Sequence, residues 1–139
     1  MSRVMAIDFG MRRIGVALSD PMGIMASGFE TINWNGQDPA YALERLSEIV
    51  KEKEVVTIVL GKPSRTDGTV SQSEEKAVAF GELLEEKTGI KPVFRDERFT
   101  TVIASQFLRQ TGVSGKDKKK VVDQVAAEII LQEFLDSHR

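Results

Sequence analysis

The sequence predicts an α/β domain in which helices cover both faces of a five-stranded mixed sheet. Strand-like runs come first, and helices then alternate with strands along the rest of the chain, an order typical of layered α/β domains. The run Val55–Leu60 is short, β-branched and almost entirely apolar, as expected for a central parallel strand that is buried on both faces. For a chain of 139 residues we expect one domain, residues 1–139, with one core.

The first three strands are predicted to be antiparallel. Val4–Phe9 and Ile14–Ser19 are joined by a short segment that contains Gly10, which permits the tight turn of a hairpin. Ala26–Asn33 alternates only weakly between polar and apolar residues. We therefore expect it to form a third strand near an edge of the sheet.

The first helix is predicted to begin at Asp38-Pro39, because Asp is a favourable N-cap and Pro is favourable at the first helical position. Its apolar residues recur at helical spacing, namely at Leu43, Leu46, Ile49 and Val50. This helix lies between Val4–Phe9 and Val55–Leu60 in the sequence. We expect it to be the crossover that makes these two strands parallel neighbours.

The polar, glycine-marked segment Gly61–Ser73 follows the central strand and is a candidate mobile loop. The next helix is predicted to begin near Ser71, where the residues from Ser71 to Glu74 fit a capping box, and to stop at Gly89. The residues of this helix predicted to face inward are Ala77, Phe80, Leu83 and Leu84.

Three elements are predicted in the last third of the chain. Pro92–Arg95 is a short strand, Thr100–Gln110 is a helix, and a final helix runs from Lys118 to about Asp136 with Asp117 as its N-cap. The resulting order is three strands, then a helix, a strand, a helix, a strand and two helices. This order supports the mixed sheet.

The composition excludes several kinds of active site. The chain has no cysteine and a single histidine, His138 beside the C-terminus, which argues against disulfides, zinc sites and Ser-His-Asp catalysis. A net charge of -2 argues against a nucleic-acid binder that relies on charge alone. Because no long apolar run is present, we expect a soluble cytoplasmic protein without a membrane partner.

Two carboxylates are predicted to lie at the ends of strands. Asp8 closes the first strand at the rim of the sheet, where ligands usually bind, although Asp also commonly hydrogen-bonds its own turn. Glu97 follows Asp96 directly after the last predicted strand, between Arg95 and Arg98. Adjacent acids with arginines beside them are also typical of a solvated turn with ion pairs.

A third carboxylate, Asp123, is predicted to lie on the apolar, sheet-facing side of the final helix. Its neighbours three, four and seven positions further along are Ala126, Ala127 and Ile130. A carboxylate in such a place must be paired, hydrogen-bonded or bound to a cation, because an isolated buried charge costs several kcal/mol. Either Lys119 or Lys120 on the same side of the helix is a possible partner.

Together, Asp8, Glu97 and Asp123 predict a site for Mg²⁺ or Mn²⁺, because hard oxygen ligands without histidine or cysteine favour these ions. Such ions activate water and stabilise phosphoryl oxygens, so the expected substrate is a phosphodiester. Basic residues near the acids are predicted to contact its phosphates, although each is also ordinary surface charge. These residues are Arg12, Arg13, Lys62, Arg98, Lys119 and Lys120.

Four blocks of the sequence resemble the YqgF/RuvX family. They are Asp8–Asp20, Leu60–Pro63 with Asp67–Thr69, Asp96–Thr101, and Lys119–Gln132. The resemblance implies a ribonuclease H-like fold, related to Holliday-junction resolvases, and a Mg²⁺-dependent nuclease that matures the 5′ end of the 16S rRNA precursor. It also implies that Asp8, Glu97 and Asp123 are the catalytic acids and metal ligands.

This chain departs from the family pattern at two positions. Phe9 stands where leucine is common, and Lys62 replaces a residue that is usually apolar.

Other functions remain open at this point. The resemblance is compatible with cleavage of branched DNA at a four-way junction instead of pre-rRNA, and with a non-catalytic factor that only binds nucleic acid. The Asp8-Phe9-Gly10 turn also resembles the phosphate-binding turn of actin-like ATPases, but those proteins need two such domains and this chain supplies one. Both a monomer and a homodimer fit the sequence.

Overall fold

The structure is a computed structural model that describes residues 3–34, 38–62, 72–96 and 115–137. The elements in chain order are β1 (Arg3–Phe9), β2 (Arg13–Ser19), β3 (Ala26–Asn33), α1 (Ala40–Glu52), β4 (Val55–Lys62), α2 (Gln72–Thr88), β5 (Val93–Asp96) and α4 (Gly115–Ser137). Among these residues, no helix is long and apolar enough to cross a bilayer.

The five strands form one mixed sheet in the order β3-β2-β1-β4-β5. The pairs β1–β2 and β2–β3 are antiparallel, and the pairs β1–β4 and β4–β5 are parallel. The edge position of Ala26–Asn33 is therefore confirmed, as is the parallel pairing of Val55–Leu60 with the first strand. Helix α1 is the crossover between β3 and β4, and it returns the chain to the end of the sheet at which β3 begins, so β4 runs parallel to β3 and to β1.

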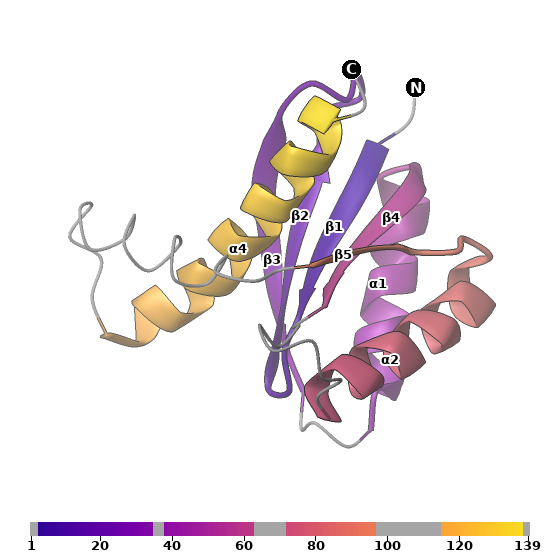
Figure 1. The fold of residues 1–139 in the computed structure, drawn as a ribbon, viewed down its shortest axis with the longest axis vertical. Coiled ribbons are helices and arrows are strands. Elements are labelled where there is room, and N and C mark those ends of the chain that lie inside the picture. Colours follow the sequence, from indigo (N-terminus) through magenta and orange to yellow (C-terminus); the bar gives the residue numbers. More distant parts are fainter. Residues whose placement is uncertain (1–2, 35–37, 63–71, 97–114, 138–139) are drawn as a thin grey trace.

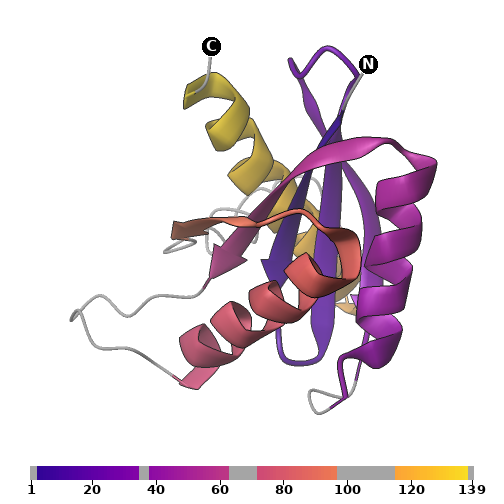
Figure 2. The same ribbon diagram turned by 90° about the vertical axis from the view of Figure 1, so that its right-hand side faces the viewer.

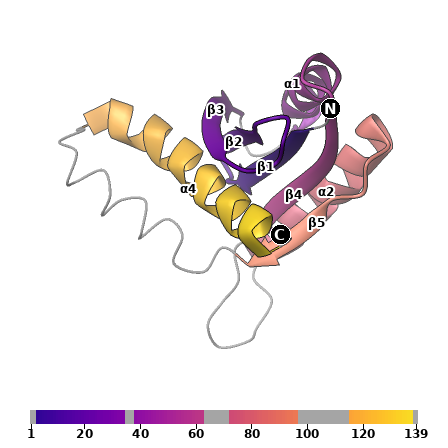
Figure 3. The same cartoon turned by 90° about the horizontal axis from the view of Figure 1, so that it is seen from above.

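Helices cover both faces of the sheet, as predicted. Figure 3 shows α4 on one side of the sheet and α1 and α2 on the other, and Figure 1 and Figure 2 show the same layers in two other views. The residues of β1 contribute alternately to two apolar clusters, because successive side chains of a strand point to opposite faces. Met5, Ile7 and Phe9 belong to the cluster beneath α1 and α2, whereas Ala6 belongs to the cluster beneath α4.

Small residues allow α4 to lie close to the sheet. The cluster beneath α4 includes Ala6 and Ala17 from the strands and Ala127 from the helix, all almost completely buried. One close approach is at Gly15 of β2, where a Cβ atom would overlap the main-chain carbonyl of Asp123. The helix therefore sits directly against β2 at this position.

The start of α1 and the end of α2 lie close to the predicted residues. The first helical residue of α1 is Ala40, one later than predicted, and the N-cap is Pro39 rather than Asp38; the Asp38 carboxylate accepts a hydrogen bond from the Ala40 amide at 3.0 Å. Helix α2 ends at Thr88, and Gly89 follows with a φ of 76°, as expected of a glycine after a helix.

The prediction that Leu83 faces inward is wrong, because its side chain is 40% exposed. Ala77, Phe80 and Leu84 are buried and define the face of α2 that packs on the sheet. Leu83 is rotated by about 100° from Leu84 around the helix axis, which places it beside that face. The predicted capping residue Ser71 and the predicted helix Thr100–Gln110 lie outside the described residues.

Candidate active site

Asp8 occupies the middle of a row of residues that crosses the sheet. In the strand register, its partner on β2 is Gly15 and its partner on β4 is Gly61. Neither neighbour has a side chain, so the space beside the carboxylate on both flanking strands is free of side-chain atoms from these two positions. Asp8 itself is only 7% exposed. The carboxylate is therefore restrained by burial and has no side chain beside it on either flanking strand, while the main chain of Asp123 occupies the space against Gly15.

The register also determines the face of the sheet on which Asp8 lies. Side chains of residues directly opposite each other in an antiparallel pair project to the same face. A Cβ atom on Gly15 would point at Asp123 in α4, so its partner Asp8 projects toward α4 as well. Ala6, two residues earlier in β1, belongs to the cluster beneath α4 and agrees with this direction. Asp8 and Asp123 therefore both lie beside Gly15.

Asp123 forms an ion pair with Arg13, the first residue of β2. The Arg13 Nε atom lies 2.7 Å from Asp123 Oδ2, and the two side chains are 34% and 17% exposed. Burial raises the pKa of the Asp123 carboxyl, and the hydrogen bond and charge of Arg13 counteract only part of that rise. Among the described side chains, Arg13 is thus a cation that pairs with this carboxylate, whereas the side chains of Lys119 and Lys120 lie outside the described residues.

Replacing Arg13 with glutamine is expected to raise the pKa of Asp123 further, because burial then acts without the opposing charge. An acid with a raised pKa in the folded state favours folding while it is protonated, and this contribution is lost as the pH rises through that pKa. Arg13→Gln should therefore steepen the loss of stability with rising pH. A ¹³C NMR titration of the side-chain carboxyls measures the pKa directly.

The matched control for this titration is Arg45→Gln, because Arg45 also pairs with an acid, Glu30 at 2.7 Å, away from Asp123. The control should leave the Asp123 titration unchanged. An equal Asp123 pKa in the wild type and in Arg13→Gln would contradict the assigned role of the ion pair.

The remaining predicted residues are placed only in part. Glu97 and Arg98 lie outside the described residues, but Asp96, directly before Glu97, ends β5 in register with Lys62 of β4. Since β1, β4 and β5 are parallel, their carboxyl ends share one edge of the sheet. Arg12 is exposed in the β1–β2 turn at that edge.

Two lysines predicted to contact phosphate lie within α4. Lys119 and Lys120 are about one helical turn before Asp123.

The donor set fits the predicted metal ion. The described residues bring two carboxylates, Asp8 and Asp123, to the same glycine, and hard oxygen donors suit Mg²⁺ or Mn²⁺. Within the described ranges no group of three metal-ligating side chains comes together, and the third predicted ligand, Glu97, falls outside those ranges.

One contributor to the site was not predicted. Trp34 fixes the turn that carries the two arginines, because its Nε1 donates to the Gly10 carbonyl at 2.7 Å and its amide donates to the Arg12 carbonyl at 3.0 Å. The signal in the sequence is that Trp34 is the single tryptophan of the chain, directly after a predicted edge strand.

Comparisons with known proteins identify the family of this chain. The family model described as RuvX, Holliday junction resolvase, matches residues 2–137. A relative from Ligilactobacillus salivarius is 46% identical over 99% of this chain and 94% of its own length. Another from Bacillus subtilis is 43% identical over 97% of this chain and 98% of its own length. Both carry the name "Putative pre-16S rRNA nuclease".

Two solved structures share the fold at low sequence identity. Thermus thermophilus RuvC in complex with a Holliday junction substrate has a TM-score of 0.60 and 11% identity, covering 99% of this chain and 96% of RuvC. Fowlpox virus resolvase with Holliday junction DNA has a TM-score of 0.56 and 10% identity, covering 98% of both chains. The expected ribonuclease H-like architecture is thus confirmed.

Proposed function

Because this chain belongs to the RuvX family, we propose that it is a metal-dependent nuclease that hydrolyses phosphodiester bonds at the 5′ end of pre-16S rRNA. The observation that carries this proposal is the placement of buried Asp8 and paired Asp123 beside Gly15, at the edge where the parallel strands end. The names of the curated relatives supply the substrate. We place the activity in the cytoplasm, within the single domain expected from the sequence.

Asp8, Asp123 and Glu97 would hold Mg²⁺ or Mn²⁺, which activates water and neutralises charge on the phosphoryl oxygens when it is bound. The chain's own residues orient this site. Asp8 is held by a central strand and cannot move far, and the Trp34 hydrogen bonds keep the Arg12–Arg13 turn in place. Arg12 is exposed and is available to bind a phosphate of the substrate.

The alternative substrate is a four-way DNA junction. It is favoured by the likeness of the fold to two resolvases that were solved with such junctions, although a shared fold does not establish a shared substrate. A nuclease assay that compares 16S precursor RNA with a four-way DNA junction, with Mg²⁺, Mn²⁺ and EDTA arms, separates the two. Cleavage of the RNA alone supports the proposal, and cleavage of the junction alone overturns it.

Binding without cleavage is a further possible outcome of that assay. If the protein binds precursor RNA but neither metal supports cleavage, the chain is a non-catalytic binding factor and the nuclease proposal is wrong.

Neutralising Lys119 and Lys120 together as glutamines is expected to weaken RNA binding while leaving turnover at saturating substrate nearly unchanged. Each phosphate contact that is lost should reduce the slope of log K against log salt by about 0.7 for single-stranded RNA. Fluorescence anisotropy of a labelled RNA across a salt series measures this slope. Lys51→Gln with Lys91→Gln, two exposed lysines elsewhere in the chain, is the charge-matched control.

A further inference from the structure

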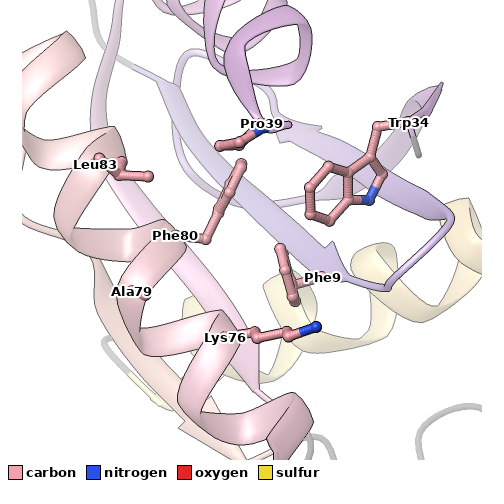
Figure 4. Close-up of a pocket in the computed structure, with 7 residues that line it drawn as sticks. All are labelled: Phe9, Trp34, Pro39, Lys76, Ala79, Phe80 and Leu83. Carbon is pink, nitrogen blue, oxygen red and sulfur yellow. The ribbon is translucent and has the colours of Figure 1, made fainter. Parts of the chain in front are cut away.

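An aromatic pocket of about 380 Å³ lies on the face of the sheet opposite α4. Figure 4 shows the side chains that surround it, which come from β1, from the residue after β3, from the residue before α1, and from α2 between Lys76 and Leu83. The residues that matter here are Phe9, Trp34, Pro39, Lys76, Phe80 and Leu83. Its volume is within the range of small-molecule sites, yet the proposed chemistry at the carboxylates does not use it.

The floor and one wall of this pocket are preformed. Phe9 and Phe80 are only 4% and 3% exposed, with ring centroids 5.0 Å apart. The Trp34 ring lies 5.6 Å from Phe9 and 6.2 Å from Phe80, and its indole N–H is held by the Gly10 carbonyl. Phe9 and Phe80 are thus a buried floor, and the partly exposed Trp34 ring is the face on which a ligand could stack. Because Trp34 is already held in place, a ligand would lose little affinity to ordering the protein.

The mouth of the pocket is different in character. Leu83 is 40% exposed, and Lys76 is exposed one helical turn after the start of α2. An apolar aromatic interior with a cation at the rim suits a planar ring that carries a negatively charged group. A nucleobase with its phosphate has this chemistry, and stacking on aromatic side chains is how unpaired bases are usually held.

The location of the pocket relates it to the carboxylates. Phe9 directly follows Asp8 in β1, and successive side chains of a strand point to opposite faces. The pocket and the carboxylates therefore lie at the same end of one strand, on the two sides of the sheet. The turn with Arg12 connects them at that edge, and Trp34 binds this turn through both of its hydrogen bonds.

We propose that this pocket binds an unpaired nucleobase of single-stranded RNA. This base lies, along the RNA strand, close to the nucleotide whose phosphodiester lies at Asp8. The inference rests on the proposed nuclease function and specifies its substrate. A base that is paired in a duplex cannot enter the pocket, so the protein selects single-stranded RNA over a fully paired end. The lysine at the rim contacts the adjoining phosphate.

Trp34 provides a direct probe, because it is the single tryptophan of the chain and it lines the pocket. The experiment titrates the protein with a short oligouridylate in EDTA, where no cleavage can occur, and follows tryptophan fluorescence together with the anisotropy of the labelled RNA. We expect saturable quenching with the same Kd by both signals. A hairpin RNA without unpaired bases should produce no quenching.

Leu83→Glu places a carboxylate in the mouth of the pocket and should weaken binding of the oligouridylate by about tenfold, the scale of losing one stacked base. Because Leu83 is already exposed, the variant should fold, which circular dichroism checks. Met22→Glu is the matched control, since Met22 is an exposed apolar residue, 69% accessible, outside the pocket. Lys76→Gln should weaken binding, and Lys91→Gln should not.

Two outcomes would overturn the proposal that this pocket binds a nucleobase. One is RNA binding by anisotropy with unchanged Trp34 fluorescence, and the other is equal affinity of Leu83→Glu and Met22→Glu. Failure of the nuclease proposal would give a different experimental result. In that case Trp34 quenching and its dependence on Leu83 persist, while the wild-type protein does not cleave with Mg²⁺ or Mn²⁺, and the pocket remains supported.

Discussion

Asp8→Asn is expected to reduce metal-dependent cleavage by at least about 100-fold, because losing the carboxylate charge removes several kcal/mol of metal-based stabilisation of the transition state. Asparagine keeps the shape and the hydrogen-bonding capacity of the side chain, so the fold should be retained. The loss should appear in kcat. RNA binding should fall far less, and it can even rise, because an anionic group facing the phosphate backbone is gone.

The assay for this variant is single-turnover cleavage of precursor RNA with Mg²⁺, with anisotropy as the separate measure of binding. Asp38→Asn is the matched control, since Asp38 is an exposed acid that accepts a hydrogen bond from the first amide of α1 and asparagine can accept the same bond. If Asp8→Asn cleaves as fast as the control in a preparation free of contaminating nuclease, the catalytic assignment is wrong. The protein would then be a binding factor.

Gly15→Ala is expected to destabilise the protein by about 1 to 3 kcal/mol, the usual cost of overpacking a close contact. The new Cβ would overlap the main-chain carbonyl of Asp123 and lie 3.0 Å from its Cβ atom, so α4 would have to move away from β2. That movement would carry Asp123 away from Asp8. We therefore expect cleavage to fall along with stability, even though glycine contributes no chemical group.

Urea denaturation followed by circular dichroism measures the free energy of unfolding of this variant. Gly28→Ala is the control, because it tests the same helix–sheet interface with a milder contact: the new Cβ would lie 3.1 Å from the Cβ of Gln124 and 3.3 Å from its Oε1, without the main-chain overlap found at Gly15. It should cost less than about 1 kcal/mol. Equal stability of Gly15→Ala and Gly28→Ala would show that α4 does not press on β2 as described.

Much of the fold could be predicted from the sequence because the information is local. The apolar run at Val55–Leu60 and the stop at Gly89 each act within a few residues, and crossover rules then restrict the strand order. The two proposed site acids on described elements were predicted from local patterns in the same way. Asp8 interrupts an otherwise apolar strand, and Asp123 interrupts the apolar side of a helix.

The tertiary structure decided how these residues meet. Periodicity shows which side of its own element a residue lies on, but not which residue of another element lies opposite. The partner of Asp123 is Arg13, 110 positions away in the sequence, and the pairing depends on where α4 crosses the sheet at Gly15. For the same reason, the sequence wrongly predicted that Leu83 faces inward and did not predict the pocket beside it. Both depend on the angle at which α2 lies over the sheet, which arises from packing among all the layers rather than from any one segment.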